Sequence, residues 1–338
     1  MNRYKKLISN TALFAISTLS SKVLVFLLMP LYTSILTPAQ YSTVDLTVQA
    51  ANLLVPLVSM GIMNAVVRFG LDKGYSHKGV FTAGVYTIAG GYIVFLLAMP
   101  LFKSEAIFAF LKGNVGIFYV YVLTACLRSL FSQFVRARNY TRLYAVDGIV
   151  STVFTIFFNV LFLVQFEWGV QGYLLAIVAA DVVSCLFLFT MAGLHRFFSP
   201  RTLEKTMLGE MLRYSLPLVP ATVFWWVTSV SDRYMVALMV GEAANGLYAA
   251  ACKIPTIVTL FSTIFTEAWQ LSAVQEKDSR SLGKFFTTIF SGLQGVVFIA
   301  ATLLIATAKI STSLLVDETF FSAWQYTPVL IVATVFSA

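Results

Sequence analysis

The chain has 338 residues, of which 59% are hydrophobic and 11% are charged, and its mean hydropathy is +0.83. A soluble globular domain has about 25% charged residues, so this composition excludes that class and indicates a polytopic membrane protein. The net charge of +8 does not indicate nucleic-acid binding, because the basic residues lie at the ends of apolar runs, where they report topology.

The N-terminus begins with basic residues and continues into an apolar run, as a signal peptide does. The run extends past Lys22 to about Leu36 and lacks a small-residue cleavage pattern. We therefore interpret it as a retained first membrane span.

Apolar segments of about 20 residues without period-two alternation recur along the whole chain, which predicts an all-α protein of membrane helices and not a β-barrel. We expect about ten spans with short connections. They are predicted at 10–36, 43–67, 79–102, 115–135, 146–166, 170–192, 214–240, 246–269, 285–308 and 323–338.

The distribution of basic residues predicts a cytoplasmic N-terminus and a multi-pass protein of the plasma membrane. With that orientation, only Lys103, Lys112 and Lys309 of the 23 Lys and Arg residues fall in external loops, and most of the others fall in cytoplasmic loops. The remaining basic residues lie inside predicted spans: Lys22, Arg128, Arg233 and Lys253.

The longest and most charged connection, 193–213, predicts a cytoplasmic linker with an amphipathic helix at the membrane surface. It separates a lobe of six helices, 1–192, from a lobe of four helices, 214–338. A weak repeat between the lobes aligns Lys22 with Arg233. Because the last apolar run stops without a polar end, we expect a truncated C-terminal lobe and about twelve spans in a complete form.

Cysteine and histidine spacing predicts no metal centre, disulfide or cofactor. The cysteines lie in apolar runs, where they behave as small buried hydrophobes, and the two histidines are single loop residues. The cysteines are Cys126, Cys185 and Cys252, and the histidines are His77 and His195. The residues leave open whether transport is coupled to Na⁺ or H⁺.

Four stretches together resemble the polysaccharide-transporter family, the Wzx-type flippases of the multidrug/oligosaccharidyl-lipid/polysaccharide superfamily. They are LSSKVLVFLLMPLYTSILTPAQYSTVDL, LVSMGIMNAVVRFG, RSLFSQFVRARNYTRLYAVDGIV and SDRYMVALMVGEAANGLYAAACKIPTI. The likeness runs from Met1 to Ala338. It departs from the family where the chain ends about two helices early and where Tyr41-Ser42 replaces a more usual Tyr-Gly pair.

The resemblance implies a two-lobe, MATE-like fold in the bacterial inner membrane and a protein that is not an enzyme. It also implies alternating-access transfer of undecaprenyl-diphosphate-linked oligosaccharide to the outer leaflet, for capsule, O-antigen or exopolysaccharide assembly. The expected partners are this lipid-linked oligosaccharide, membrane lipids and polysaccharide assembly proteins.

The basic residues inside the spans predict a cationic cavity for the diphosphate, in keeping with the family, because a charge in a span faces an interior and not lipid. Arg128 and Arg233 are expected to hold phosphate bidentately, and Lys22 to follow it as a point charge. Lys253 is the fourth candidate, although its stem can also snorkel outward. The acids inside the spans, Asp181 and Asp232, are expected to compensate part of this charge or to take part in coupling.

Alternatives remain open for these residues. The charged side chains can instead form pairs that fix helix packing, such as Asp232 with Lys253. The Pro217-x-x-Pro220 sequence predicts a hinge that loosens the helix carrying Arg233, or else a static kink.

Aromatic and terminal residues of the spans also have two interpretations. Trp225 and Trp226 can stack on sugars, although adjacent aromatic residues more often pack or face lipid. Residues near span ends are expected to act as interfacial anchors. These are Trp168, Trp269, Trp324, Arg68 and Glu267.

Two other functions compete with the flippase. A cation-coupled multidrug exporter of the same fold would offer mainly acidic residues to its substrates, and the excess of bases argues against it. A membrane polymerase, ligase or acyltransferase needs an external catalytic constellation, and the short external loops contain none that we recognise.

Overall fold

The computed structural model describes residues 26, 28–98, 100, 109–111, 113–200, 204–260, 262 and 282–337. All regular structure in this part of the chain is helical, which confirms the predicted all-α class. The chain divides into two compact units, Ala39–Glu242 and Met1–Pro38 with Ala243–Ala338. These limits differ from the expected lobes 1–192 and 214–338, which stay a prediction.

The unit Ala39–Glu242 begins with α3 (Pro38–Val58) and α4 (Ile62–Leu71), which meet at an angle of 54°. The sequence predicted one span at 43–67. The chain breaks there because Met60 and Gly61 have positive φ values of 51° and 63°, a conformation in which a helix cannot continue. The predicted single span is therefore a bent pair of helices.

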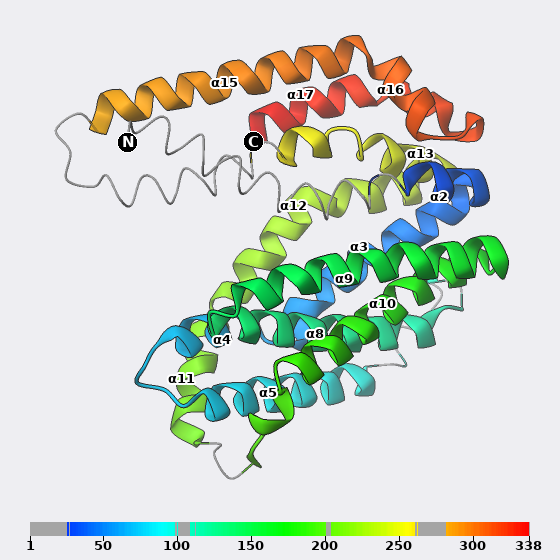
Figure 1. Cartoon of the computed structure of the whole chain (residues 1–338). Coiled ribbons are helices and arrows are strands. Elements are labelled where there is room, and N and C mark those ends of the chain that lie inside the picture. Colours follow the sequence, from blue (N-terminus) through cyan, green and yellow to red (C-terminus); the bar gives the residue numbers. More distant parts are fainter. Residues whose placement is uncertain are drawn as a thin grey trace. The chain divides into compact units, whose positions relative to one another are not determined.

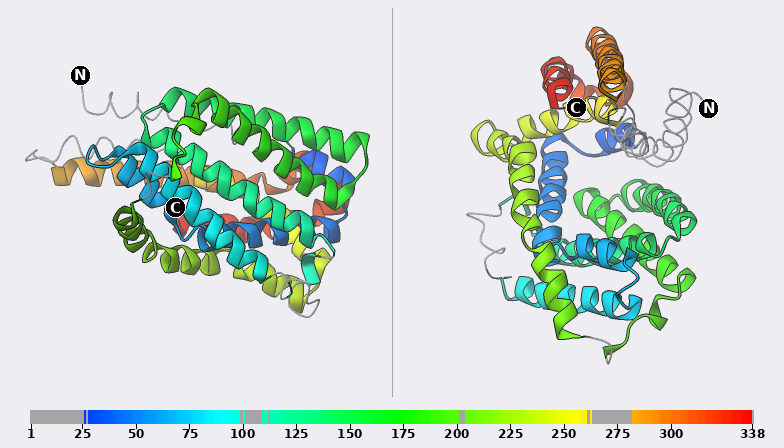
Figure 2. Two further views of the ribbon diagram at one scale, coloured as in Figure 1. Left: turned by 90° about the horizontal axis from the view of Figure 1, so that it is seen from below. Right: turned by 90° about the vertical axis from the view of Figure 1, so that its left-hand side faces the viewer.

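Three long helices of this unit pack side by side, as both Figure 1 and the left view of Figure 2 show. They are α8 (Val115–Ala137), α9 (Thr141–Asn159), which continues into the π-helix η2 (Val160–Gln165), and α10 (Gly169–Met191). With α5 (His77–Leu97), they confirm the helices predicted at 79–102, 115–135, 146–166 and 170–192. Two short 3₁₀ turns, η1 (Ala109–Leu111) and η3 (Leu194–Arg196), lie in connections.

The core of the unit lies where α4 and α5 pack on α8. Val66, Phe81, Leu130 and Phe134 are buried there. Glycine lets α5 approach the end of α3 closely, since a Cβ added at Gly91 would lie 1.8 Å from the carbonyl oxygen of Val58. Residues from α3, α4, α5 and α8 are thereby held in one packed body.

The predicted linker contains α11 (Lys205–Ser215), followed directly by α12 (Leu218–Met239). Met207 and Met211 of α11 are buried, and the helix packs on α4 and α5. The predicted amphipathic helix is thus present. Its apolar side packs on apolar residues of α4 and α5, and its place at the membrane surface stays a prediction.

The other unit contains α2 (Met29–Ile35), α13 (Glu242–Ala251), α15 (Leu282–Ala306), α16 (Ala308–Leu315), the 3₁₀ helix η5 (Glu318–Gln325) and α17 (Thr327–Ser337). Helices α15 and α17 pack together, and Ile254, Ala301 and Ile331 form a small buried cluster. The Asp317 N–H donates to Thr33 Oγ1 at 3.0 Å, which ties the segment before η5 to α2.

Four helical stretches in the described part of the chain are long and apolar enough to cross a membrane, and the number rises to seven if each bent pair is one span. Helix α12 is not among them because Asp232, Arg233 and its hydroxyl-bearing residues lower its hydropathy. The chain is thus a multi-pass membrane protein, while the predicted count of ten includes residues outside the described part.

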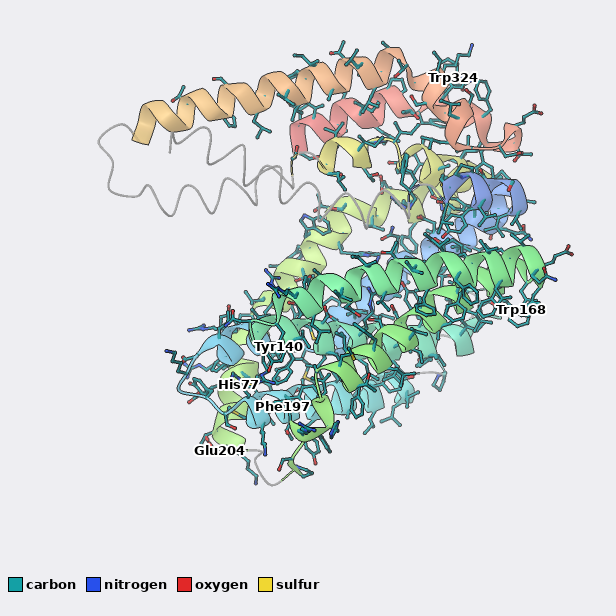
Figure 3. All side chains as sticks on the ribbon, viewed as in Figure 1. His77, Tyr140, Trp168, Phe197, Glu204 and Trp324 are labelled. Carbon is teal, nitrogen blue, oxygen red and sulfur yellow. The ribbon has the colours of Figure 1, made fainter. Side chains whose placement is uncertain are left out.

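The predicted cytoplasmic loops and a predicted external loop lie at opposite ends of unit Ala39–Glu242. In Figure 3, His77, Tyr140, Phe197 and Glu204 lie at one end of this unit, and Trp168 lies at the opposite end. This arrangement is the one that the alternation of loops in the sequence requires.

Candidate functional site

An ion pair joins α12 to α3 inside unit Ala39–Glu242. Arg233 Nη1 lies 2.5 Å from Asp45 Oδ1, and the two side chains are only 13% and 5% exposed. Burying two charges is unfavourable unless they are paired. The pair therefore places a guanidinium in the interior at a defined position.

Aromatic residues of α12 support this pair. Tyr234 Oη donates to the Leu46 carbonyl at 2.8 Å, and Trp226 Nε1 donates to the Gln49 carbonyl at 2.9 Å. Arg233 and Tyr234 follow Trp226 by seven and eight residues, so the three side chains share one face of the helix. Several contacts to two turns of α3 thus fix the orientation of Arg233.

Asp45 was not among the sequence-based candidates for the partner of Arg233. Asp232 is exposed, and its Oδ1 accepts the backbone N–H of Arg233 at 2.9 Å. Its role in compensating charge stays a prediction. The two adjacent tryptophans have different surroundings. Trp225 is 70% exposed, whereas Trp226 packs against Tyr234 with ring centroids 5.6 Å apart. Packing is therefore the role that the structure gives Trp226.

A second ion pair joins α8 to α10. Arg128 Nη1 lies 2.8 Å from Asp181 Oδ1, and the side chains are 35% and 4% exposed. One turn along α10, Ser184 Oγ donates to Asp147 Oδ1 of α9 at 2.5 Å. Asp147 is buried and was also absent from the sequence-based candidates. Charged and polar side chains thus connect all three long helices.

The buried acids of this unit include two that the sequence did not indicate. Arg128 and Arg233 are accompanied by three buried carboxylates, those of Asp45, Asp147 and Asp181, of which only Asp181 was a candidate. Arg128 pairs with Asp181, and Arg233 pairs with Asp45. The expected cationic cavity also includes Lys22 and Lys253, and it stays a prediction.

Pro217 and Pro220 lie at the start of α12, with Pro217 as its N-cap and Pro220 in its first turn. The amide groups of a first turn have no partner within the helix, so proline removes no helical hydrogen bond there. Pro217 and Pro220 therefore do not weaken the interior of the helix that carries Arg233. The pair instead separates α11 from α12, and its role as a hinge stays a prediction.

The remaining candidates are placed as follows. Lys22, Glu267 and Trp269 lie outside the described residues, and Lys253 follows α13 in the other unit. Trp168 is the N-cap of α10 and stacks on Phe162, with centroids 5.2 Å apart. Trp324 lies in η5, with Lys309 Nζ 5.2 Å from the centre of its ring. Arg68 is exposed near the end of α4.

Comparison with known proteins gives one family. The family model described as "Polysaccharide biosynthesis protein" matches residues 7–270. No curated protein matches the chain.

Solved structures of MATE transporters share the fold. An inward-facing multidrug resistance MATE family transporter of the MOP superfamily has a TM-score of 0.68 at 15% identity, with 96% of this chain and 81% of that chain covered. The Vibrio cholerae MATE transporter VcmN in its bent form has a TM-score of 0.63 at 17% identity, with 99% of this chain and 81% of that chain covered. At these identities the likeness shows the MATE-like fold and no more.

Proposed function

We propose that this chain, which belongs to the polysaccharide biosynthesis protein family and has a MATE-like transporter fold, moves an undecaprenyl-diphosphate-linked oligosaccharide to the outer leaflet of a bacterial plasma membrane. The family match links the chain to polysaccharide assembly, and the fold links it to transport. In this proposal the N-terminus is cytoplasmic and the transfer proceeds by alternating access.

The observation that carries the proposal is the buried pair of Arg233 with Asp45. Phosphate and carboxylate oxygens fit the same planar set of guanidinium donors. A diphosphate can therefore replace Asp45 at Arg233 without leaving the guanidinium unpaired in the interior. Arg128 and Asp181 offer a second exchange of the same kind.

The exchange needs a position for the released carboxylate. Asp45 Oδ2 is buried and has no hydrogen-bond partner among the described residues. A buried carboxylate whose arginine has left needs a new positively charged partner. This is where proton or Na⁺ coupling would enter, and Asp45 is the positioning residue for Arg233.

Membrane potential favours the proposed direction. A negatively charged diphosphate leaving an inside-negative cell moves down the electrical gradient, at about 2.3 kcal/mol per elementary charge for 100 mV. Outward transfer of the lipid-linked sugar is thus favourable in electrical terms even before coupling to another ion.

A multidrug exporter is the second candidate, and the three buried carboxylates favour it more than the sequence did. Such an exporter would bind cationic substrates at Asp45, Asp147 or Asp181 and would not need Arg128 and Arg233. Replacing both arginines with Gln therefore separates the two functions.

The test uses a strain in which the gene is deleted. It measures the amount of the lipid-linked oligosaccharide in the inner and in the outer leaflet. We expect the lipid-linked oligosaccharide to accumulate in the inner leaflet, and the wild-type gene to restore its appearance in the outer leaflet. The variant Arg128→Gln/Arg233→Gln should not restore it, whereas Arg136→Gln/Arg138→Gln, which removes two arginines at the end of α8, should. Accumulation in the outer leaflet would instead indicate a polymerase or ligase, and full rescue by the first variant would rule out the arginine mechanism.

A further inference from the structure

A pocket of about 340 Å³ lies between the end of α4 and α11, and none of the residues of the two ion pairs lines it. It is at the end of unit Ala39–Glu242 where Figure 3 places His77 and Glu204, the end that the basic loops assign to the cytoplasm. Two arginines, two carboxylates and two tyrosines line it: Arg68, Asp72, Tyr75, Glu210, Arg213 and Tyr214.

The walls of this pocket are held by contacts between the two helices. Tyr75 Oη donates to Glu210 Oε2 at 2.7 Å, and the Arg68 guanidinium lies 4.3 Å from the centre of the Tyr214 ring. The Phe69 ring packs edge-on against Tyr75, with centroids 4.8 Å apart. The pocket is thus formed by packed side chains and not by a loose loop.

Neither arginine of the pocket forms an ion pair with any described residue. A guanidinium can still stack on an aromatic ring and offer its N–H groups in the ring plane to an anion. Glu210 uses one carboxylate oxygen for Tyr75. Asp72 accepts the Gly74 N–H at 2.9 Å through Oδ1. The pocket therefore presents two cations beside two anions, with no net formal charge.

We propose that this pocket binds the zwitterionic phosphoethanolamine headgroup of a membrane phospholipid, with the phosphate at Arg68 and Arg213 and the ammonium at Asp72 and Glu210. A purely anionic ligand would be repelled by the two carboxylates, which argues against the diphosphate of the transported lipid. The volume is at the low end of the roughly 300–1,000 Å³ of small-molecule sites, which suits a headgroup. This site does not depend on the proposed transport function.

The test measures lipid binding to the purified, delipidated full chain by native mass spectrometry. The probes are phosphatidylethanolamine, phosphatidylcholine, whose methylated nitrogen donates no hydrogen bond, and anionic phosphatidylglycerol, each with palmitoyl-oleoyl chains. We expect phosphatidylethanolamine to bind most tightly, and Arg68→Gln/Arg213→Gln to weaken it about tenfold or more, as expected for losing a charged hydrogen bond. The matched control Lys73→Gln/Lys78→Gln removes the same charge from the same end of the unit outside the pocket, and should change binding little.

A second variant tests the ammonium half of the site. Asp72→Asn/Glu210→Gln should retain phosphate binding and lose the preference for phosphatidylethanolamine over phosphatidylcholine. Soluble O-phosphoethanolamine distinguishes a lipid site from a site for the free headgroup, since only the second would be competed at similar concentrations. The proposal is overturned if phosphatidylglycerol binds as tightly as phosphatidylethanolamine, if the soluble compound competes as well as the lipid, or if both double variants weaken binding equally.

Discussion

Arg233 on α12 and Asp45 on α3 are 188 residues apart in sequence, yet their side chains form a buried ion pair. Removing one partner of such a pair leaves an uncompensated charge, which costs about 3–5 kcal/mol, whereas removing both can be nearly neutral. The pair therefore gives separate predictions for stability and for transport.

We expect Asp45→Asn to lower the thermal stability of the purified protein strongly, and Asp45→Asn/Arg233→Gln to recover most of the loss. Thermal unfolding in detergent measures both. The control is Glu204→Gln, which neutralises an exposed carboxylate away from the pair and should have little effect. Equal stability of the single and double variants would mean that the pair is not coupled.

The sequence predicted the helices well where apolar runs were long and uninterrupted, as in α8 and α10. It missed Asp45 and Asp147 because each lies at the start of its predicted span, 43–67 and 146–166. The helices begin earlier, at Pro38 and Thr141, so both acids lie inside.

The break between α3 and α4 was also missed, since a single Gly61 within an apolar run is weak evidence of a bend. The partners of the arginines could not be predicted at all. The pairs join residues 53 and 188 positions apart, and only the packing of the helices brings them together.

Arg128 and Arg233 differ in exposure, with 35% against 13% of their side chains accessible, and this difference predicts unequal effects. Arg233→Gln should destabilise the protein more than Arg128→Gln, because solvent screens the ion pair of the more exposed Arg128 and so lowers its contribution to stability. Both should reduce transfer of the lipid-linked oligosaccharide about tenfold or more. Arg128→Lys should fall between wild type and Arg128→Gln, since it keeps the charge without the planar fork.

Transfer in that series is measured by leaflet-resolved quantification of the intermediate, with protein amounts in the membrane matched. If Arg128→Gln lowers transfer only in proportion to its lower abundance, Arg128 has a packing role and no role in substrate binding.

Two adjacent glycines of α5 test the close approach of α5 to α3. A Cβ at Gly91 would lie 1.8 Å from the Val58 carbonyl oxygen, while a Cβ at Gly90 meets nothing within 4 Å. Gly91→Ala should destabilise the protein by about 1–3 kcal/mol or more, as overpacking does. Gly90→Ala makes the same change in helix propensity one residue away, so it should be neutral or slightly stabilising. Similar melting temperatures for both variants would contradict this packing.

The Tyr75–Glu210 hydrogen bond predicts that the stability of the protein depends on pH. Tyr75 lies in the connection between α4 and α5, outside the membrane spans. Accepting this bond, the Glu210 carboxylate raises the pKa of Tyr75 above its usual value of 10.0, with a smaller effect of burial. The folded state thus favours neutral tyrosine. The stabilisation from this bond is fully present below pH 10 and is lost as the pH rises through the raised pKa. Melting temperatures of wild type and Tyr75→Phe should therefore differ by a constant amount below pH 10 and converge above it.

A control for this prediction is Tyr86→Phe, which changes an exposed tyrosine of α5 and for which no such convergence is expected. If the difference between wild type and Tyr75→Phe persists unchanged to the highest pH at which the protein remains folded, the hydrogen bond does not stabilise the contact between α11 and the segment before α5.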